Sequence, residues 1–212
     1  MTRQRLVWLT NTKDVLQSIP LLLPSMHGKV WWSKISVVDR GLQALTNTSI
    51  VQKIDRCAQE DCMEQMEVFD LAKPIEFQQH WKYRYLFDLD GAGFSGRFIP
   101  FLQSRSLPFK SAIFREWYSS RLTPWLHFVP QDVRLHDVYS TLIYFMGLKT
   151  SVGGRKSYVG AHEREATYIA ESGRDWANKI LRKEDMEIYM FRLLLEWGRL
   201  TDDQRDIIGF TV

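Results

Sequence analysis

A glycine-rich run that follows a stretch of alternating aromatic residues has the composition of a phosphate-binding loop. It contains Gly91, Gly93, Ser95, Gly96 and Arg97. Glycines let a backbone approach a phosphate closely and adopt positive φ, a serine caps a helix or donates its hydroxyl, and a planar guanidinium binds two phosphate oxygens. The spacing predicts a pyrophosphate pocket. A glycine-rich turn with an ordinary N-cap serine and a solvated arginine fits the same spacing, so both interpretations stay open.

The residues that flank this loop predict a strand before it and a helix after it. Tyr83, Tyr85 and Phe87 alternate with polar residues, which is typical of a half-buried strand, here ending near Asp90. Apolar residues then recur at spacings that suit a helix with one buried face: Phe98, Ile99, Phe101 and Leu102. The free N–H groups and the macrodipole at the start of a helix attract anions, so Phe98 joins the predicted site.

Asp88 and Asp90 form a D-x-D pair that offers a second interpretation, a divalent ion held against a diphosphate. Residues two apart on a strand face the same way, which would allow both to coordinate. The loop that follows already supplies backbone donors and an arginine, so a metal ion would be redundant. We therefore expect no metal and no other cofactor, and we expect both aspartates to orient the loop through backbone hydrogen bonds.

Glu116 is a further candidate for the same site, as a ligand of the ribose of a nucleotide. A carboxylate at the start of a helix in a nucleotide-binding domain can accept hydrogen bonds from both ribose hydroxyls. The alternative is a glutamate that is favoured at a helix N-terminus by the dipole alone. The sequence does not choose between these two interpretations.

Composition describes one globular domain without a signature for nucleic acid or membrane. The 212 residues are 45% hydrophobic and 13% aromatic, enough for a buried core. The formal net charge is +3 and no basic helix or block of like charge stands out, so a nucleic-acid partner is not implied. No apolar run approaches the roughly eighteen residues of a membrane span, and the first apolar stretch is too short for a signal peptide.

The two cysteines of the chain, Cys57 and Cys62, are five positions apart. Two ligands without a second pair or a nearby histidine do not make a zinc site. A disulfide stapling the loop between them and two free thiols are equally compatible with the spacing, and a disulfide would favour an oxidising, luminal compartment.

Short strands and helices alternate along much of the chain. We predict strands at Arg5–Thr10, in the run 50–55, and at 106–111 and 125–130, with short strands and irregular connections over 18–45. Trp31 and Trp32 are expected to pack as core or as an interdomain contact. Helical segments are predicted around 63–69, at 116–122 before Pro124, and after an N-cap at Asp132.

The last third of the chain predicts an irregular segment followed by two amphipathic helices. Residues 147–162 are glycine-rich and unpatterned, which favours a flexible surface insertion. Two apolar stripes follow, over 166–180 and 186–197. Strands that alternate with helices in this way predict an α/β fold, a mostly parallel sheet with helices on both faces, in which ligands bind at the carboxyl ends of the strands.

Several runs, in order, give the chain a family resemblance: HWKYRYLFDLDGAGFSGRF, SLPFKSAIFREWYSSRLTPWLHFVPQD and EREATYIAESGRDWANKILRKEDMEIYMFRLLLEW. They resemble the C-terminal half of the fungal capsule-associated glycosyltransferases, which are related to the animal protein O-glucosyltransferases and O-xylosyltransferases. The resemblance covers 57–212, while 1–56 match weakly. It implies one Rossmann-like, donor-nucleotide-binding domain of a two-domain GT-B enzyme.

The resemblance also implies an activity and partners. The implied reaction is metal-independent transfer from a UDP-sugar, such as UDP-xylose or UDP-glucose, to a hydroxyl of a glycan or protein. The general base of the family is an aspartate in the acceptor-binding half, which no segment here matches, so no catalytic residue is assigned. The alternative is an inactive domain that binds a nucleotide sugar without transfer. Relatives of this kind act in the Golgi or ER lumen, whereas this chain shows no anchor or signal.

Two further expectations come from the same comparison. Trp125 and His127 match a motif that lies near the donor site in the family, but a histidine within an apolar strand is more often a satisfied core residue, so His127 receives no catalytic role. The apolar stripe of the last helix, Met186 to Trp197, exceeds what one edge of a small sheet covers. We expect part of it to be exposed and to cause self-association.

Overall fold

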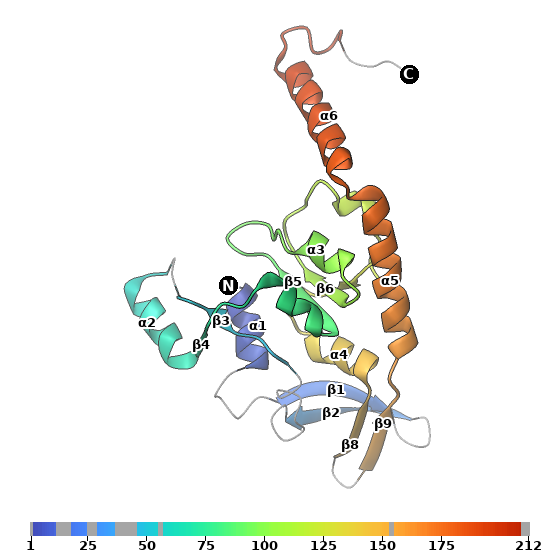
Figure 1. Ribbon diagram of the computed structural model, residues 1–212. Helices are drawn as coiled ribbons and strands as arrows, with labels where there is room; N and C mark the ends of the chain where they lie inside the picture. The colour runs from blue at the N-terminus through green and yellow to red at the C-terminus, as the bar shows by residue number, and fades with distance from the viewer. Residues whose placement is uncertain are drawn as a thin grey trace.

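The computed structural model describes residues 2–11, 18–24, 29–36, 46–54, 57–152 and 155–208. At its centre lies a parallel sheet of three strands, β5 (Tyr85–Leu89), β6 (Leu107–Ser111) and β7 (Val129–Pro130), in the order β5-β6-β7 (Figure 1). Helices follow these strands along the chain and cover the sheet. The α/β, Rossmann-like fold class predicted from the alternation of strands and helices is confirmed.

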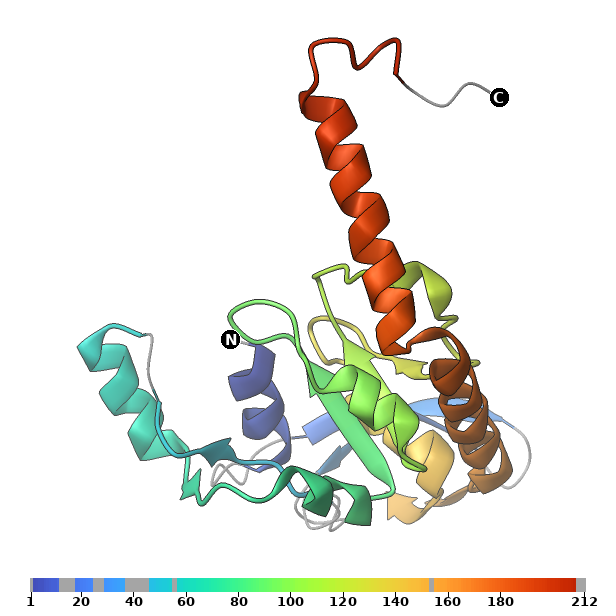
Figure 2. The ribbon, with the colours of Figure 1, turned by 45° about the horizontal axis from the view of Figure 1, so that its top comes forward.

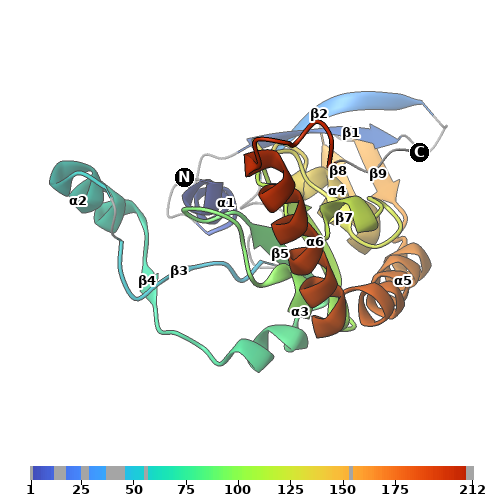
Figure 3. The same ribbon diagram turned by 90° about the horizontal axis from the view of Figure 1, so that it is seen from above.

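The two faces of the sheet carry different side chains. Phe109, Leu89 and Val129 face the larger core, which is completed by helices α4 (Val138–Met146) and the first half of α5 (Glu163–Ile180). On the opposite face lies α3 (Phe98–Gln103), which packs against the second half of α5. Seen from above, α3 and α4 lie on opposite sides of β5 (Figure 3). Helices therefore cover both faces, as predicted.

Helix α5 touches the loop before β7 more closely than a side chain would permit. A Cβ atom built on Gly173 would lie 2.2 Å from the carbonyl oxygen of His127. This distance is far below van der Waals contact, so only a glycine fits here while the two backbones keep their present separation.

The strand predicted at Arg5–Thr10 is wrong, because α1 (Thr2–Thr10) is a helix. The β-prone side chains of this run are buried at helical spacing. Leu6 joins the main core, Val7 contacts Ile54 and Phe69, and the Thr10 hydroxyl donates to the Leu6 carbonyl at 2.6 Å. Packing against the sheet has overridden the local strand preference.

Two antiparallel hairpins lie at one end of the molecule (Figure 1). The first joins β1 (Ser18–Pro24) to β2 (Val30–Ser36), which confirms short strands in this region. Trp31 packs against the small core of this hairpin as expected, whereas Trp32 is 71% exposed and is not core.

The second hairpin joins β8 (Leu148–Val152) to β9 (Arg155–Val159), so the segment 147–162, in which the sequence showed no pattern, contains a regular pair of strands. In β9, Ser157 is buried while its neighbours Lys156 and Tyr158 are exposed. Because the buried residue is polar, the alternation does not show in the hydrophobicity of the sequence.

The remaining short elements differ from the prediction mainly in their lengths. The 50–55 strand is reduced to β3 (Ile50–Val51), which pairs in parallel with β4 (Leu71–Ala72). Helix α2 (Gln59–Val68) begins earlier than predicted, and the 3₁₀ helix η2 (Phe77–Lys82) occupies the residues before β5. The helix predicted at 116–122 is only the 3₁₀ turn η3 (Ser119–Arg121).

Two boundaries near β7 were predicted wrongly. The strand expected over 125–130 is limited to Val129 and Pro130, because the Leu126 and His127 N–H groups both donate to the Thr123 carbonyl and form a turn. Asp132 does not cap α4; the N-cap position is Asp137, whose carboxylate instead accepts the backbone N–H of Asp132.

The two closing helices are confirmed, and the second of them projects from the rest of the structure. α6 (Lys183–Thr201) leaves the end of α5 and extends away from the sheet (Figures 1 and 2). None of its residues, all of which the structure describes, is buried. Within the described ranges, no helix combines the length and the apolar character that a membrane span requires.

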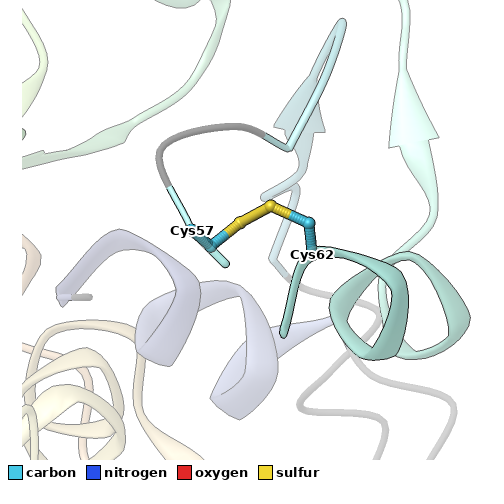
Figure 4. Close-up of a disulfide and its surroundings, with 2 residues drawn as sticks. All are labelled: Cys57 and Cys62. Atoms are coloured by element: carbon cyan, nitrogen blue, oxygen red, sulfur yellow. A yellow bond between two sulfur atoms is a disulfide. The ribbon is translucent and has the colours of Figure 1, made fainter. Parts of the chain in front are cut away.

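Cys57 and Cys62 form a disulfide, which settles the choice between a bridge and two free thiols (Figure 4). The bridge joins Cys57, which precedes α2, to Cys62 in the first turn of α2. Both cysteines pack beside Val7, Ile54 and Phe69. The disulfide thereby ties α2 to the cluster that holds α1.

Candidate functional site

The glycine loop follows β5 at the carboxyl end of the sheet, where α/β folds bind their ligands. Cβ atoms built on Gly93 and Gly96 would meet nothing within 4 Å, so the backbone of the loop has open space beside it. The positive φ that glycine permits is not used here: among the described glycines, only Gly147 has one. These glycines therefore give access to the backbone rather than an unusual conformation.

Ser95 is directed into the protein and does not cap α3. It is 1% exposed and its hydroxyl donates a short hydrogen bond to Oδ1 of Asp88, which is completely buried. The helix that begins at Phe98 has no side-chain N-cap bond. Ser95 thus anchors the loop to β5 from below, and the rest of the loop remains exposed above it.

Arg97 lies at the rim of the same group. Its Nε is 3.4 Å from the Ser95 hydroxyl and 3.7 Å from Oδ1 of Asp88, and its side chain is 37% exposed. Burial and the neighbouring charge of Arg3 lower the pKa of the Arg97 guanidinium, while Asp88 opposes that shift. Arg97 is therefore held in position by Asp88 and Ser95, with part of its guanidinium facing solvent.

Arg3 is a residue of this site that the sequence did not reveal. It reaches from α1, and its Nε and Nη2 donate to the Leu89 carbonyl at 3.3 and 3.2 Å. Nη2 of Arg97 lies 3.5 Å from the same oxygen, and the Arg3 guanidinium is 3.1 Å from a Cβ built on Gly91. Two guanidinium groups therefore meet where β5 ends and the glycine loop begins. No sequence pattern links residues so far apart.

Lys110 is the second residue that was missed, and it is the centre of the buried network. Its Nζ lies 3.1 Å from Oδ2 of Asp88 and 3.1 Å from Oε2 of Glu116, and 4.1 Å above the centre of the Phe98 ring. The Lys110 side chain is only 9% exposed. Asp88 and Lys110 are register partners on β5 and β6, so their side chains share a face. A lone lysine within the apolar strand 106–111 was the signal available in the sequence.

Glu116 belongs to this network and is not a free ligand at a helix start. Its Oε2 also accepts a hydrogen bond from the Tyr118 hydroxyl. Burial and this bond to Glu116 raise the pKa of the Tyr118 phenol far above its ordinary value, so Tyr118 stays a hydrogen-bond donor. Phe98 forms the floor of the network, being fully buried beneath Lys110. The structure therefore brings Ser95, Arg97, Phe98 and Glu116 together.

Asp90 orients a loop, but a different loop from the one predicted. Its Oδ2 accepts the backbone N–H groups of Ile113 and Phe114 at 2.6 and 3.2 Å, which fixes the segment between β6 and Glu116. Its Oδ1 is buried without a partner among the described residues. Asp88 instead binds side chains. In the part of the chain that the structure describes, no three His, Cys, Asp or Glu residues group as metal ligands.

His127 is a core histidine whose ring nitrogen has a hydrogen-bond partner, as expected for a residue to which the sequence assigned no catalytic role. It is 7% exposed, its Nδ1 accepts the Thr123 N–H at 3.0 Å, and its ring stacks on Trp176. Burial lowers its pKa, which favours the neutral form. Trp125 is 52% exposed and precedes β7, at the opposite end of the sheet from the glycine loop. Neither residue is part of the site described above.

The arrangement at the carboxyl end can bind a multiply charged anion. Accessible backbone and two guanidinium groups lie at the surface, and a buried group of two carboxylates, a lysine and a tyrosine supports them from below. Guanidinium groups bind phosphate oxygens with two parallel hydrogen bonds. A diphosphate is one anion of this kind.

Comparisons with known proteins identify the family of the chain. The sequence matches the profile of glycosyl transferase family 90 over residues 34–206, and the chain belongs to this family. It is 30% identical over 132 residues to the O-glucosyltransferase rumi homolog of Anopheles gambiae, and 29% identical over 129 residues to Protein O-glucosyltransferase 1 of Homo sapiens. These matches span 61% and 60% of this chain but only 30% and 29% of the relatives, so the chain corresponds to less than a third of their length.

Replacing Lys110 by methionine is expected to destabilise the fold strongly. The variant leaves Asp88 and Glu116 buried without their shared counter-charge, and breaking a buried ion pair typically costs roughly 3–5 kcal/mol. Urea unfolding monitored by circular dichroism measures the loss. The control is Lys82→Met on the exposed surface of η2, which should change the free energy of unfolding little. Equal effects of the two substitutions would show that the network does not stabilise the fold.

Proposed function

We propose that this chain binds the diphosphate of a UDP-sugar at the glycine loop and takes part in transfer of the sugar to a hydroxyl of a glycan or protein. The observation that carries the proposal is the meeting of Arg3 and Arg97 at the Leu89 carbonyl, beside open loop backbone. The relatives named as O-glucosyltransferases favour UDP-glucose as the donor, with UDP-xylose as the second candidate. In this proposal the backbone of Gly91, Gly93 and Gly96 faces the diphosphate. Glu116, whose Oε2 is engaged by Lys110 and Tyr118, accepts the ribose hydroxyls through its other carboxylate oxygen.

The chemistry of this transfer explains why the site is cationic. When the bond between the sugar and the diphosphate breaks, negative charge develops on the departing phosphate oxygen, and fixed guanidinium groups stabilise it. The acceptor hydroxyl must also lose its proton to a base. We assign that base to no described residue. The alternative, a domain that binds the nucleotide sugar without transferring it, is distinguished by whether UDP is released from UDP-glucose when an acceptor is added.

Two finer assignments accompany this proposal. The motifs quoted above support a place near the fungal capsule-associated branch of the family. The disulfide between Cys57 and Cys62 supports action in an oxidising compartment such as the ER or Golgi lumen, because cytosolic thiols are kept reduced.

Removing the guanidinium of Arg97 should weaken binding of UDP. We expect Arg97→Ala to cost about 2 kcal/mol, near thirtyfold in Kd, the scale of a charge-assisted hydrogen bond. Arg97→Lys should recover only part, because an ammonium cannot form two parallel bonds. Isothermal titration calorimetry measures both, and Arg3→Ala should also weaken binding.

Arg5→Ala is the matched control for the two arginine variants, since Arg5 lies on the same helix but contacts His136. It should leave the affinity for UDP unchanged. If Arg97→Ala and Arg97→Lys both bind UDP as the wild type does, the diphosphate is not bound at this loop.

Binding of UDP is expected not to require a divalent metal ion. Asp88 is saturated by Ser95 and Lys110, and one oxygen of Asp90 is engaged by two backbone N–H groups, so the D-x-D pair is poorly placed to hold an ion. The Kd for UDP should be the same in EDTA and in millimolar manganese. A large gain with manganese that disappears in Asp90→Asn would contradict this expectation.

We further propose that the exposed face of α6 makes the chain self-associate. Its apolar stripe is between 37% exposed at Tyr189 and 66% exposed at Trp197. Acidic residues lie near the start of the helix and arginines toward its end, so two antiparallel copies would place opposite charges side by side: Glu184, Asp185 and Glu187 against Arg192 and Arg199.

Light scattering on the purified chain tests this association. The wild type should be larger than a monomer, and the double substitution Met190→Glu with Trp197→Glu should be monomeric and still folded, because both side chains are exposed. A monomeric wild type would remove the proposal. The exposed pair Met63→Glu and Met66→Glu on α2 is the control and should not change the mass.

A further inference from the structure

The amino end of the sheet, opposite the glycine loop, carries two adjoining hollows over the first half of α5. Their volumes are about 520 and about 460 Å³, and they share Arg164 and Tyr168. The larger is lined from the loop before β7, the end of α4 and the start of α5, chiefly by Trp125, Tyr144 and Ile169. The smaller continues along α5 to Arg84. Together they form an elongated surface that the proposed donor site does not use.

Three exposed aromatic rings border this surface, and the structure holds two of them, Trp125 and Tyr144, in place. Trp125, Tyr144 and Tyr168 are 52%, 42% and 63% exposed. Trp125 has a φ of 63°, rare for a residue with a side chain, and its N–H donates to the Phe128 carbonyl at 2.8 Å. Tyr144 stacks on the His162 ring with centroids 3.9 Å apart. Exposed rings on fixed backbone are suited to contact a ligand without a large loss of conformational entropy.

The charged groups around the hollows balance one another. Arg84 pairs with Glu163 at 3.2 Å, and beside them lie Arg164 and Glu165. The side chains of Arg164 and Glu165 have no hydrogen bond or ion pair with any residue that the structure describes. Two cations and two anions give no net charge, in contrast to the arginine pair at the carboxyl end. Such a lining fits a neutral ligand rich in hydroxyl groups better than a nucleotide or another anion.

We propose that this surface binds a neutral oligosaccharide, with one sugar ring in each hollow. A pyranose has an apolar face of C–H groups, which packs on an aromatic ring, and hydroxyls around its edge, which hydrogen-bond to guanidinium and carboxylate groups. Trp125 and Tyr168 contact the faces of the rings, and Arg164 and Glu165 bind their hydroxyls. The two hollows meet at Arg164 and Tyr168, so the ligand has at least two linked sugars.

This glycan is distinct from the sugar that the proposed function transfers. The glycine loop follows the carboxyl end of β5, whereas Trp125 precedes β7 and Tyr144 lies in the last turn of α4, at the other end of the sheet. A ligand here is bound as part of a longer chain and undergoes no reaction. The inference therefore does not depend on the donor assignment.

Saturation-transfer difference NMR with cellobiose and maltose, two neutral disaccharides, tests the proposal. The wild type should transfer saturation to ring protons of at least one of them. Trp125→Ala and Tyr168→Ala should weaken its Kd at least tenfold, and Trp125→Phe should retain part of the affinity because a ring remains. Tyr158→Ala, which removes a tyrosine that is 60% exposed on β9, is the matched control and should bind as the wild type does.

Competition separates this site from the donor site. Saturating UDP should not reduce the disaccharide signal, and Arg97→Ala should leave it unchanged. The proposal is overturned if neither disaccharide binds the wild type, if Tyr158→Ala loses as much affinity as Tyr168→Ala, or if UDP displaces the sugar. Failure of UDP to bind, with disaccharide binding intact, would instead refute the donor assignment alone.

Discussion

The ammonium group of Lys110, buried between two carboxylates, is the interaction on which the site depends. Removing three charged groups from water is costly, and the cost is offset here because each group has several partners. Asp88 also accepts the Ser95 hydroxyl, and Glu116 also accepts that of Tyr118. The network therefore joins β5, β6, the glycine loop and the segment after β6. Lys110 thus links these four elements, in addition to the ladder between β5 and β6 and the bonds of Asp90 to the segment after β6.

This construction separates the groups that support the site from those that can bind a ligand. Both oxygens of Asp88 and Oε2 of Glu116 already have ammonium or hydroxyl partners, so these carboxylates repel an incoming anion less than free carboxylates would. Arg3 and Arg97 remain at the rim, where carbonyl and carboxylate oxygens orient them before any ligand arrives. A site that is oriented in advance loses less entropy on binding. The chain belongs to glycosyl transferase family 90, and this membership is the reason why the diphosphate proposed for the rim is that of a nucleotide sugar.

The sequence predicted those parts of the fold whose signals are local. The alternating aromatics of β5, the apolar run of β6 and the apolar stripes of α5 and α6 are local patterns, and all four elements are present. The stripe of α6 predicted the helix correctly although none of its residues is buried. The same reasoning failed for α1, because its β-branched and aromatic residues are packed as a helix by contacts far along the chain. It failed for β8 and β9 because polar side chains gave no period. For the site, the loop residues were found, while Arg3 and Lys110 depend on register and long-range docking that no local pattern records.

The close contact at Gly173 provides a point about which α5 could tilt. Residues before it lie on the core beneath the sheet, residues after it pack on α3, and at Gly173 itself the helix touches the His127 carbonyl without any side chain between. The helix is thus pinned at mid-length to the loop that carries Trp125. A shift of α3 would tilt α5 about this point as a rigid lever, and the opposite end, with Arg164 and Tyr168, would move in the reverse direction.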